Sequence, residues 1–567
     1  MDISKIRKDF PILTRKMSDK PLVYLDNGAT TLKPQPVIDA VVNYYTYLGA
    51  NAHRGDYEMS AQVDAAFEGA RVRTQKFLNA KYKEEIVFTS GSSEGLNLVA
   101  MMVTNQLLHE GDVILSDESE HASSILPWMQ AGKKKGTKID YIPLDEDGKI
   151  TVENFKSVLT DKVKVVAIAM VSNVLGFVAP VKEIAKICHE RGILLVIDGA
   201  QSTPHLDIDV QDLDCDFYAF SAHKMCGPTG VGALYGKKKW LDQLEPIFYG
   251  GESNARFDKT CSLTLKETPL KFESGTQPIE GVIGMAAAMD YLDAIGKENI
   301  HAHEVELKEY FLEKAKALGN IVVYNENAKS GIVTFNVKDK DQMIFAQDVA
   351  SYLNTFGIAV RSGQHCAKLL PEVLKTPGTC RASFYLYNTK EEVDQLIDAL
   401  KNATVENCVS IFCEEGSLIM SNIDPMLMRQ IIMDHYDYPR NKKLTDKDGY
   451  MSRHMASDSC IDDITVQTKI SNGKIDDVRF DGVACTISTA STSIMSELLK
   501  GKTTQEAKEI MDNYFKMIDQ KEYDEDVLDE AIAFQNVGKQ ANRINCATIG
   551  WKAMREMIKE SEDGKNE

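Results

Sequence analysis

Apolar residues in the first part of this chain fall into short continuous runs, separated by stretches with helical spacing. Continuous runs are typical of parallel strands that are buried on both faces. Their alternation with helices from about residue 85 to 236 predicts a mainly parallel sheet with helices on both faces. The predicted fold class is therefore α/β. The runs that we assign to strands lie within 85–89, 112–117, 164–170, 192–198 and 216–221.

The stretch from about residue 331 to 402 has a second pattern, with fewer strands and helices than the first part of the chain. Gly331–Asn336 and Gly357–Arg361 read as strands, with a helix from about Gln342 to Phe356 between them. This predicts a smaller α+β region, which a last helix from Lys390 to about Asn402 completes. Residues 403–420 show no clear periodicity. We therefore expect one unit over residues 1–405 and a linker over 406–420.

The pattern changes again beyond the linker, and residues 421–567 are expected to form a separate α+β domain. Asp424 followed by Pro425 predicts a helix start, since Asp favours the N-cap and Pro the first turn. Two alternating strands meet at Asn472-Gly473, which is a strong signal for a β-hairpin. Further helical patterns follow.

Composition narrows the class of protein. The 567 residues are 43% hydrophobic and 26% charged, as in a soluble globular protein, and the length predicts more than one domain. No apolar run reaches membrane-spanning length, and the N-terminus lacks a signal-peptide core. The net charge of −19 argues against nucleic acid as the main partner. Eleven cysteines without an export signal favour reduced thiols, so we expect a cytoplasmic protein without a membrane or nucleic-acid partner.

Two polar groups end neighbouring predicted strands. The run before Asp198 places a carboxylate at a strand's carboxyl end, where ligands bind in α/β sheets. The run before Ser221 leads into His223 and Lys224, and a turn rich in Gly and Pro follows. A lysine there suits Schiff-base chemistry, because burial lowers its pKa. A surface lysine at a strand end would give the same local pattern.

Two further strand ends carry candidate residues. The strand–turn–helix around Gly91 would direct backbone N–H groups and the hydroxyls of Ser92 and Ser93 at a phosphate. An ordinary helix N-cap explains those serines equally well. His121 follows another strand and could stack on a pyridine ring and move protons, although a lone histidine is more often structural.

Asp198-Gly-Ala-Gln201 with Ser221-Ala-His223-Lys224-x-x-Gly-Pro-x-Gly resembles the cysteine desulfurases, which are fold-type I pyridoxal phosphate (PLP) enzymes. The resemblance implies that Lys224 binds PLP covalently and that Asp198 pairs with the pyridine nitrogen. It implies a homodimer as well, because Thr276 matches a threonine that reaches the phosphate held by the other protomer. The PLP-binding residues that it implies are Ser92, Ser93, His121, Asn173, Asp198, Gln201, Ser221, His223, Lys224 and Thr276.

The stretch Arg361-Ser-Gly-Gln-His365-Cys366 resembles the nucleophile loop of SufS-like (group II) desulfurases, with Gln364 in place of a histidine. The implied reaction converts L-cysteine to L-alanine through a persulfide on Cys366, with Lys224 and His121 as the other catalytic residues. Arg381 matches the arginine that binds the substrate carboxylate, and Arg361 and Asn173 are the other implied substrate contacts.

In the second half, three cysteines and an aspartate make a plausible tetrahedral zinc set, although their long spacing is weak support by itself. Cys-x-Asp, Gly-x-x-Cys-x-Ile-Ser and Arg-Ile-x-Cys-Ala resemble SufU, a zinc-binding sulfur acceptor. This chain has Ile461 where SufU has glycine, and Asn545 where IscU-like scaffolds have histidine. The implied zinc ligands are Cys460, Asp462, Cys485 and Cys546.

Together these resemblances imply a fusion of a desulfurase with its own sulfur acceptor, which serves iron–sulfur assembly with scaffold proteins of the SUF type. In zinc-using pairs of this kind a desulfurase histidine exchanges onto the zinc. Gln347 occupies that position here, so another ligand or direct attack by Cys460 or Cys485 is expected. Two alternatives stay open: a selenocysteine lyase or another PLP lyase in the first half, and an iron–sulfur scaffold or structural zinc module in the second.

Overall fold

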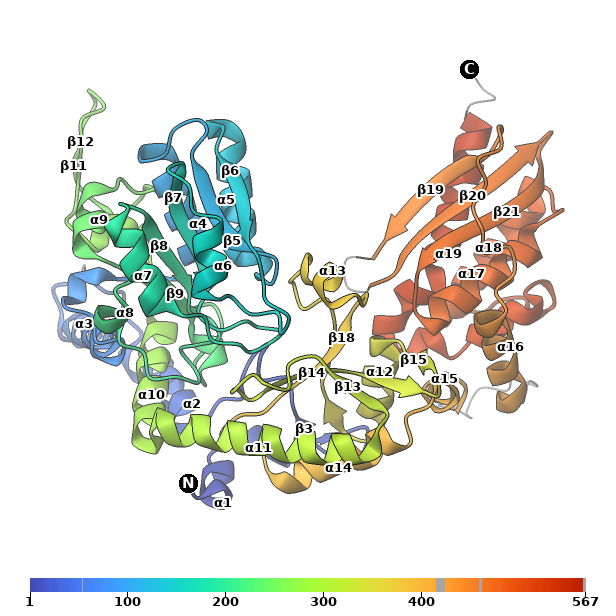
Figure 1. Cartoon of the computed structure of the whole chain (residues 1–567), viewed down its shortest axis with the longest axis horizontal. Coiled ribbons are helices and arrows are strands. Elements are labelled where there is room, and N and C mark those ends of the chain that lie inside the picture. The colour runs from blue at the N-terminus through green and yellow to red at the C-terminus, as the bar shows by residue number, and fades with distance from the viewer. Residues whose placement is uncertain (54, 415–423, 458–460, 564–567) are drawn as a thin grey trace.

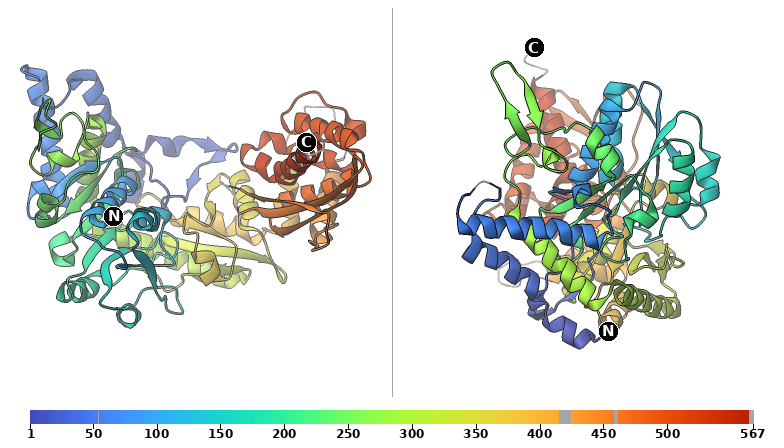
Figure 2. Two further views of the ribbon diagram at one scale, coloured as in Figure 1. Left: turned by 90° about the horizontal axis from the view of Figure 1, so that it is seen from above. Right: turned by 90° about the vertical axis from the view of Figure 1, so that its left-hand side faces the viewer.

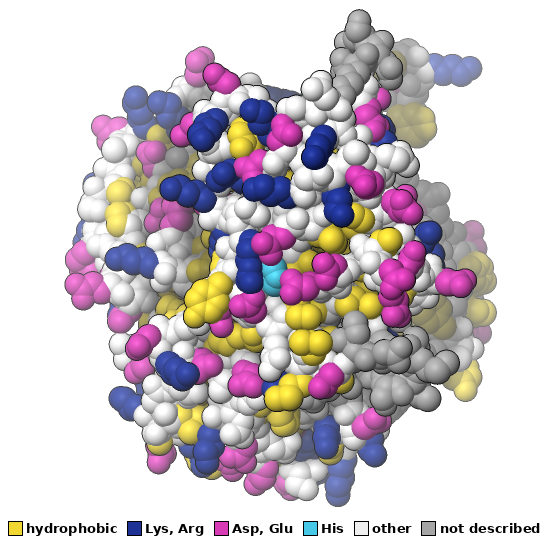
Figure 3. All heavy atoms as spheres, turned by 90° about the vertical axis from the view of Figure 1, so that its right-hand side faces the viewer, with side chains coloured by type: hydrophobic (Ala, Val, Ile, Leu, Met, Phe, Trp, Pro, Cys, Tyr) yellow, Lys and Arg dark blue, Asp and Glu magenta, His cyan; other side chains and the backbone are white. Residues whose placement is uncertain are grey.

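The computed structural model describes residues 1–53, 55–414, 424–457 and 461–563. It has a large domain, a smaller domain beside it and a C-terminal domain docked on the smaller one (Figure 1; Figure 2). Within these residues, no helix is long and apolar enough to cross a membrane. Acidic and basic side chains are interspersed around a central group of hydrophobic side chains on the face of the molecule that Figure 3 shows.

The large domain is built on a seven-stranded sheet, counted over the described residues, in the order β4-β10-β9-β8-β7-β5-β6. The pairs from β9 to β6 are parallel, and β10 runs antiparallel to both of its neighbours. The strands are β4 (Ile86–Thr89), β5 (Val113–Asp117), β6 (Lys138–Ile142), β7 (Val163–Ala169), β8 (Leu194–Asp198), β9 (Phe217–Ser221) and β10 (Gly232–Gly236).

Helices cover both faces of this sheet, and the strands are apolar because separate hydrophobic clusters pack on the two sides. The predicted mainly parallel α/β sheet is therefore confirmed. The helices of this domain include α2 (Gln35–Asn43), α3 (Glu58–Phe77), α4 (Ser92–Gln106), α5 (Ala122–Lys135), α6 (Val152–Ser157), α7 (Val181–Glu190), α8 (Val210–Leu213), α9 (Lys238–Gln243) and α10 (Ile279–Ile295), and a hairpin of β11 (Asn254–Phe257) and β12 (Leu263–Leu265) projects from it.

The small domain has an antiparallel sheet in the order β13-β14-β18-β17, with β15 paired to β14. The expected helix from Gln342 is shorter than predicted, because Gln342–Met343 forms an edge strand. The expected strand at 357–361 forms two strands and not one. Ile358–Ala359 pairs with Val23–Tyr24, and a separate strand begins at Arg361. The elements of this domain include β3 (Val23–Tyr24), α11 (Lys297–Leu318), β13 (Ile321–Val323), β14 (Ile332–Asp339), β15 (Gln342–Met343), α12 (Ala346–Thr355), β16 (Ile358–Ala359), β17 (Arg361–Gly363), α13 (Leu370–Leu374), β18 (Thr379–Ser383) and α14 (Lys390–Lys401). Helix α1 (Ile3–Lys8) buries Ile6 in the core of the large domain.

The segment expected as an irregular linker begins with a helix, α15 (Val405–Glu414). Val405, Cys408 and Val409 have i, i+3, i+4 spacing, and they are buried in a core shared with the C-terminal domain. The linker prediction overlooked this short apolar stripe. Residues 415–423 lie outside the described part of the chain.

The C-terminal domain packs helices against a three-stranded antiparallel sheet. The predicted hairpin at Asn472-Gly473 is confirmed: both residues have positive φ, at 53° and 77°, and Ser471 pairs with Lys474. The elements are α16 (Pro425–Asp437), β19 (Met451–Ala456), β20 (Asp463–Ser471), β21 (Lys474–Val483), α17 (Thr486–Leu499), α18 (Thr504–Ile518) and α19 (Ala541–Asp563).

Candidate active site and metal centre

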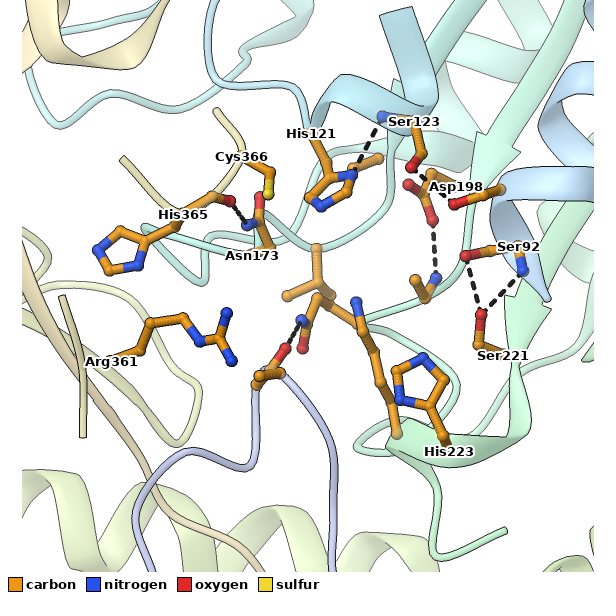
Figure 4. A pocket seen from close by; sticks show the side chains of 18 of the residues that line it. Ser92, His121, Ser123, Asn173, Asp198, Ser221, His223, Arg361, His365 and Cys366 are labelled. Carbon is orange, nitrogen blue, oxygen red and sulfur yellow. Dashed lines mark hydrogen bonds between the residues drawn. The ribbon is translucent and has the colours of Figure 1, made fainter. Parts of the chain in front are cut away.

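A pocket of about 290 Å³ lies at the carboxyl ends of the central strands, where the large and small domains meet. Of the residues predicted to bind PLP and substrate, only Thr276 is not in its lining. The lining residues are Gly28, Ala29, Ser92, Ser93, His121, Ser123, Ala169, Val171, Asn173, Asp198, Ala200, Gln201, Ser221, His223, Lys224, Arg361, His365, Cys366 and Arg381 (Figure 4).

Lys224 follows the end of β9, in a short turn of 3₁₀ helix. Desolvation lowers the pKa of Lys224 to about 8, even though the nearby carboxylate of Asp198 acts in the opposite direction. Asp198, the last residue of β8, is buried and accepts a hydrogen bond from the backbone N–H of Ala200 (2.9 Å). The pocket thus combines a weakly basic amine with a buried carboxylate.

The start of α4 forms one wall of the pocket. Gly91 precedes the helix with a φ of 150°, and a Cβ there would lie 3.1 Å from Ser221 Oγ. Ser221 Oγ accepts from the Ser92 N–H (2.8 Å), and Ser93 Oγ lies 2.7 Å from Ser123 Oγ. Hydroxyls from two helix starts therefore converge on one place, as a phosphate site requires.

His121 caps helix α5, where its Nδ1 accepts a hydrogen bond from the Ser123 N–H (3.1 Å). The proton of a neutral ring is therefore on Nε2. Desolvation, with smaller contributions from Lys224 and Arg381, lowers the pKa of His121 to about 4. The imidazole is consequently neutral at physiological pH.

Gln201 is buried, and its side-chain N–H donates to the Gly28 carbonyl (2.6 Å). Among the described residues, no hydrogen-bond partner is found for its buried Oε1. This orphaned acceptor, the amine, the carboxylate and the paired helix starts match the polar groups of PLP. The residues present therefore fit the cofactor.

Cys366 is exposed on a loop that follows β17. His365 and Cys366 both have left-handed backbones, with φ of 53° and 60°, a conformation that costs energy for residues other than glycine. The Cys366 carbonyl accepts from the Ala122 N–H (2.8 Å) at the start of α5. Figure 4 shows the Cys366 side chain on the same side of the pocket as His121 and Asn173.

Arg381 lies on β18 and is buried. Its Nη1 donates to the Asn173 carbonyl (2.7 Å), and its Nη2 lies 3.4 Å from Asp26 Oδ1. Arg361 forms an ion pair with the same Asp26 at 3.0 Å. Sequence reasoning missed Asp26, although a carboxylate directly after the strand Val23–Tyr24 and its neighbour Leu25 is a usable signal.

Thr276 lines a separate small cavity together with Asn51, His53 and Gly275. It therefore does not contribute to the pocket of its own chain. Glu273 of the same motif is buried and forms two hydrogen bonds with Arg71, at 2.7 and 2.9 Å.

A second cluster of possible ligands lies in the C-terminal domain. Ligand atoms of Asp462, Cys485 and Cys546 all lie within 4.8 Å of one another, and the three side chains are buried. Cys485 caps α17, as the predicted helix after it requires. The fourth predicted ligand, Cys460, falls outside the described residues.

Burial, followed by contact with Cys546 and the charge of Asp462, raises the pKa of Cys485 well above its usual range. Burial and a neighbouring carboxylate both disfavour the thiolate form of the two cysteines. A bound cation would offset this, because its positive charge stabilises the thiolates. Sulfur and oxygen ligands at this spacing suit tetrahedral Zn²⁺, with bonds of roughly 2.0–2.3 Å. The described ligands therefore fit zinc.

Asn545 is not aimed at this cluster as a ligand. Its side-chain N–H donates to Ser457 Oγ (2.9 Å), and its Oδ1 accepts from Lys552 Nζ (3.0 Å). Asn545 thus joins α19 to Ser457, which directly follows β19.

Comparison with known proteins agrees with both halves. Residues 23–396 match the Aminotransferase class-V family, and residues 427–562 match the NifU-like N terminal domain. A probable cysteine desulfurase of Halalkalibacterium halodurans is 46% identical over 401 residues, which cover 71% of this chain and 98% of the relative. A cysteine desulfurase of Haloferax volcanii is 43% identical over 418 residues, which cover 71% and 97%.

Among solved structures, the apo cysteine desulfurase of Thermococcus onnurineus NA1 superimposes with a TM-score of 0.66 at 36% identity. It covers 70% of this chain and 97% of that one. The predicted PLP fold-type I architecture and the predicted resemblance are thereby confirmed. This chain belongs to the class-V aminotransferase family: its first part is a PLP-dependent cysteine desulfurase, and its second part is a domain of the NifU-like N-terminal type.

Proposed function

We propose that this protein converts L-cysteine to L-alanine, keeps the sulfur as a persulfide on Cys366, and passes it to the zinc site of its own C-terminal domain for iron–sulfur cluster assembly. The observation that carries the proposal is the position of Cys366. It is exposed on a strained loop, and it opens into the pocket that holds Lys224 and Asp198. A transaminase has no use for a nucleophilic thiol there.

Lys224, Asp198, Gln201 and the helix starts at Ser92 and Ser123 would hold PLP. When bound, the cofactor withdraws electrons from the substrate carbons and so permits C–S cleavage. The chain itself supplies orientation. Buried Arg381 would bind the substrate carboxylate, because its planar guanidinium can donate two parallel hydrogen bonds.

The Cys366 thiolate then attacks the sulfur of the substrate. An S–S bond forms while the C–S bond breaks, and a proton replaces sulfur on the substrate carbon to give alanine. Neutral His121, with its proton on Nε2, would hand protons to groups in the pocket. No external oxidant is required, because the sulfur that Cys366 receives is the one that the substrate loses.

The outer sulfur next passes to a thiolate of the C-terminal domain, and Cys366 leaves as a thiolate. Zinc bound by Asp462, Cys485, Cys546 and Cys460 would keep the acceptor thiol deprotonated. Joining the two domains raises the effective concentration of the acceptor. Scaffold proteins of the SUF type would be the next recipients.

We further propose a homodimer formed by the desulfurase domains. Thr276 lies in a cavity separate from its own pocket, as expected if it serves the phosphate of the partner. The β11–β12 hairpin leaves Phe257 72% exposed, which favours a covering chain.

The experiment measures alanine and sulfide released from L-cysteine with reductant, together with metal content, for the unmodified chain and for Cys485→Ala. We expect the variant to lose its zinc and most of its turnover. Cys188→Ala, a buried cysteine outside both sites, is the matched control. Unchanged turnover after loss of the metal would make the second domain an appendage, and a brown protein as isolated would make it a cluster scaffold.

A further inference from the structure

Helix α12 of the desulfurase lies beside the C-terminal domain (Figure 1), and its Asp348 contacts that domain directly. Asp348 on this helix forms an ion pair with Arg543 at 2.9 Å, and both side chains are 1% exposed. Asp348 Oδ2 also accepts a hydrogen bond from the hydroxyl of Thr486 at 2.6 Å and one from its backbone N–H at 3.3 Å. Arg543 in turn donates to Ser351 Oγ, one helical turn further along α12.

Both partners of Asp348 lie close in sequence to the predicted cysteine ligands. Thr486 directly follows Cys485 at the start of α17, and Arg543 precedes Cys546 by three residues on α19. One carboxylate of the desulfurase therefore holds both segments that carry the described cysteine ligands. Its negative charge also faces the N-terminal end of α17, where a helix favours anions.

A third contact joins the segment around Asp462 to the strand that supports the Cys366 loop. Ile461, next to Asp462, packs on Gly378, where any Cβ would collide with Ile461 Cδ1. Gly378 precedes Thr379, whose hydroxyl lies 2.9 Å from His365 Nε2. The segment that brings Asp462 to the metal cluster thus rests on the strand that supports the Cys366 loop.

Buried ion pairs add little net stability, but they favour one orientation strongly, because any other arrangement leaves a charge buried and unpaired. Here the orientation in question is that of the ligand-bearing segments relative to Cys366. We propose that Asp348 is a positioning residue for sulfur transfer: it docks the metal centre of the same chain on the desulfurase. This inference rests on the proposed transfer of sulfur to the second domain.

The test compares the unmodified chain with Asp348→Leu in a single turnover with L-cysteine. Mass spectrometry of the peptides that contain Cys485 and Cys546 measures the arrival of sulfur. Alanine formed in the same single turnover, which needs only Cys366 to take the sulfur, and metal content are measured in parallel. We expect sulfur transfer to fall at least tenfold while both other quantities change less than twofold. Asp398→Leu, an exposed aspartate on α14, is the matched control.

Asp348→Glu keeps the charge and should recover part of the transfer rate, which a purely structural role does not predict. Should Asp348→Leu lose its metal, the double variant Asp348→Leu/Arg543→Met removes both charges. We then expect metal to return while transfer stays slow. Transfer at the unmodified rate in either variant would overturn the proposal.

Absence of sulfur on the second domain of the unmodified chain would overturn both the proposed transfer and this role of Asp348. Amide hydrogen exchange separates that failure from a failure of docking. In the unmodified chain, residues 346–355 and 486–490 should be protected, and Asp348→Leu should speed their exchange at least tenfold. Equal exchange in both proteins would show that Asp348 does not hold the domains together.

Discussion

The side-chain amide of Asn173 donates a 2.8 Å hydrogen bond to the backbone carbonyl of His365. Asn173 follows strand β7, whereas His365 precedes Cys366, the predicted nucleophile, in the small domain. The backbone carbonyl of Asn173 accepts from Arg381. Asn173 therefore connects Arg381, the predicted substrate arginine, and the loop of the predicted nucleophile to the central sheet.

Asn173→Ala should lower the rate of alanine formation about 10- to 100-fold, because the Cys366 loop loses its attachment to the sheet and small displacements of reacting groups are costly. Steady-state kinetics with L-cysteine would measure this. Asn154→Ala, which removes only an exposed bond to the Pro143 carbonyl, should change the rate less than twofold. Equal effects of the two variants would contradict the role given to Asn173.

Cys366→Ser should abolish persulfide formation and lower alanine formation at least about 100-fold, since a serine hydroxyl cannot accept the sulfur of the substrate. The absorbance of bound PLP should stay unchanged, because Cys366 is placed to attack substrate and not to hold the cofactor. Cys261→Ser changes another exposed cysteine, outside the pocket, and should retain full activity. Alanine formation in Cys366→Ser near the unmodified rate would refute the nucleophile.

Covalent uptake of PLP by the apoprotein should depend on pH. Only the neutral amine of Lys224 can attack the aldehyde, and desolvation lowers its pKa to about 8. The neutral fraction, and with it the uptake rate, should rise about tenfold per pH unit below pH 8 and level off above it. Borohydride trapping followed by mass spectrometry measures the rate. A rise that continued to pH 10 would mean that Lys224 has an ordinary pKa.

Arg71→Met should destabilise the large domain by about 3–5 kcal/mol, because the variant leaves Glu273 buried without its charged partner. Calorimetry should show a lower melting temperature for this domain. Arg73 lies two residues after Arg71 and forms ion pairs with the exposed Asp290 and Asp293. Arg73→Met removes these pairs and should lower the stability of the domain by about 1 kcal/mol or less. Similar melting temperatures for both variants would contradict this assignment of Arg71.

Local pattern predicted five strands of the seven-stranded sheet, because a buried parallel strand must be apolar throughout. It also predicted groups that lie together in the pocket, such as Asp198 and Lys224, since the carboxyl ends of neighbouring strands meet at one edge. The roles of these residues, of Thr276 and of the metal ligands stay predictions.

Features that depend on contacts distant in the sequence were not predictable in this way. Asp348 reads as one polar position on an otherwise apolar helix face, and its partner Arg543 lies in another domain. The apolar stripe of α15 is too short to stand out from the irregular sequence around it. The partners of both features lie in the C-terminal domain, so their roles are seen only in the folded structure.

Helix α15 buries Cys408 and Val409 in a hydrophobic core that includes residues of both domains, among them Val349 and Ile432. The NifU-like domain is therefore packed on the desulfurase through a common core, and is not connected to it by the chain alone. Each ribosome that finishes this chain delivers one desulfurase with one NifU-like domain, so their ratio is set during translation and does not depend on the expression of two genes.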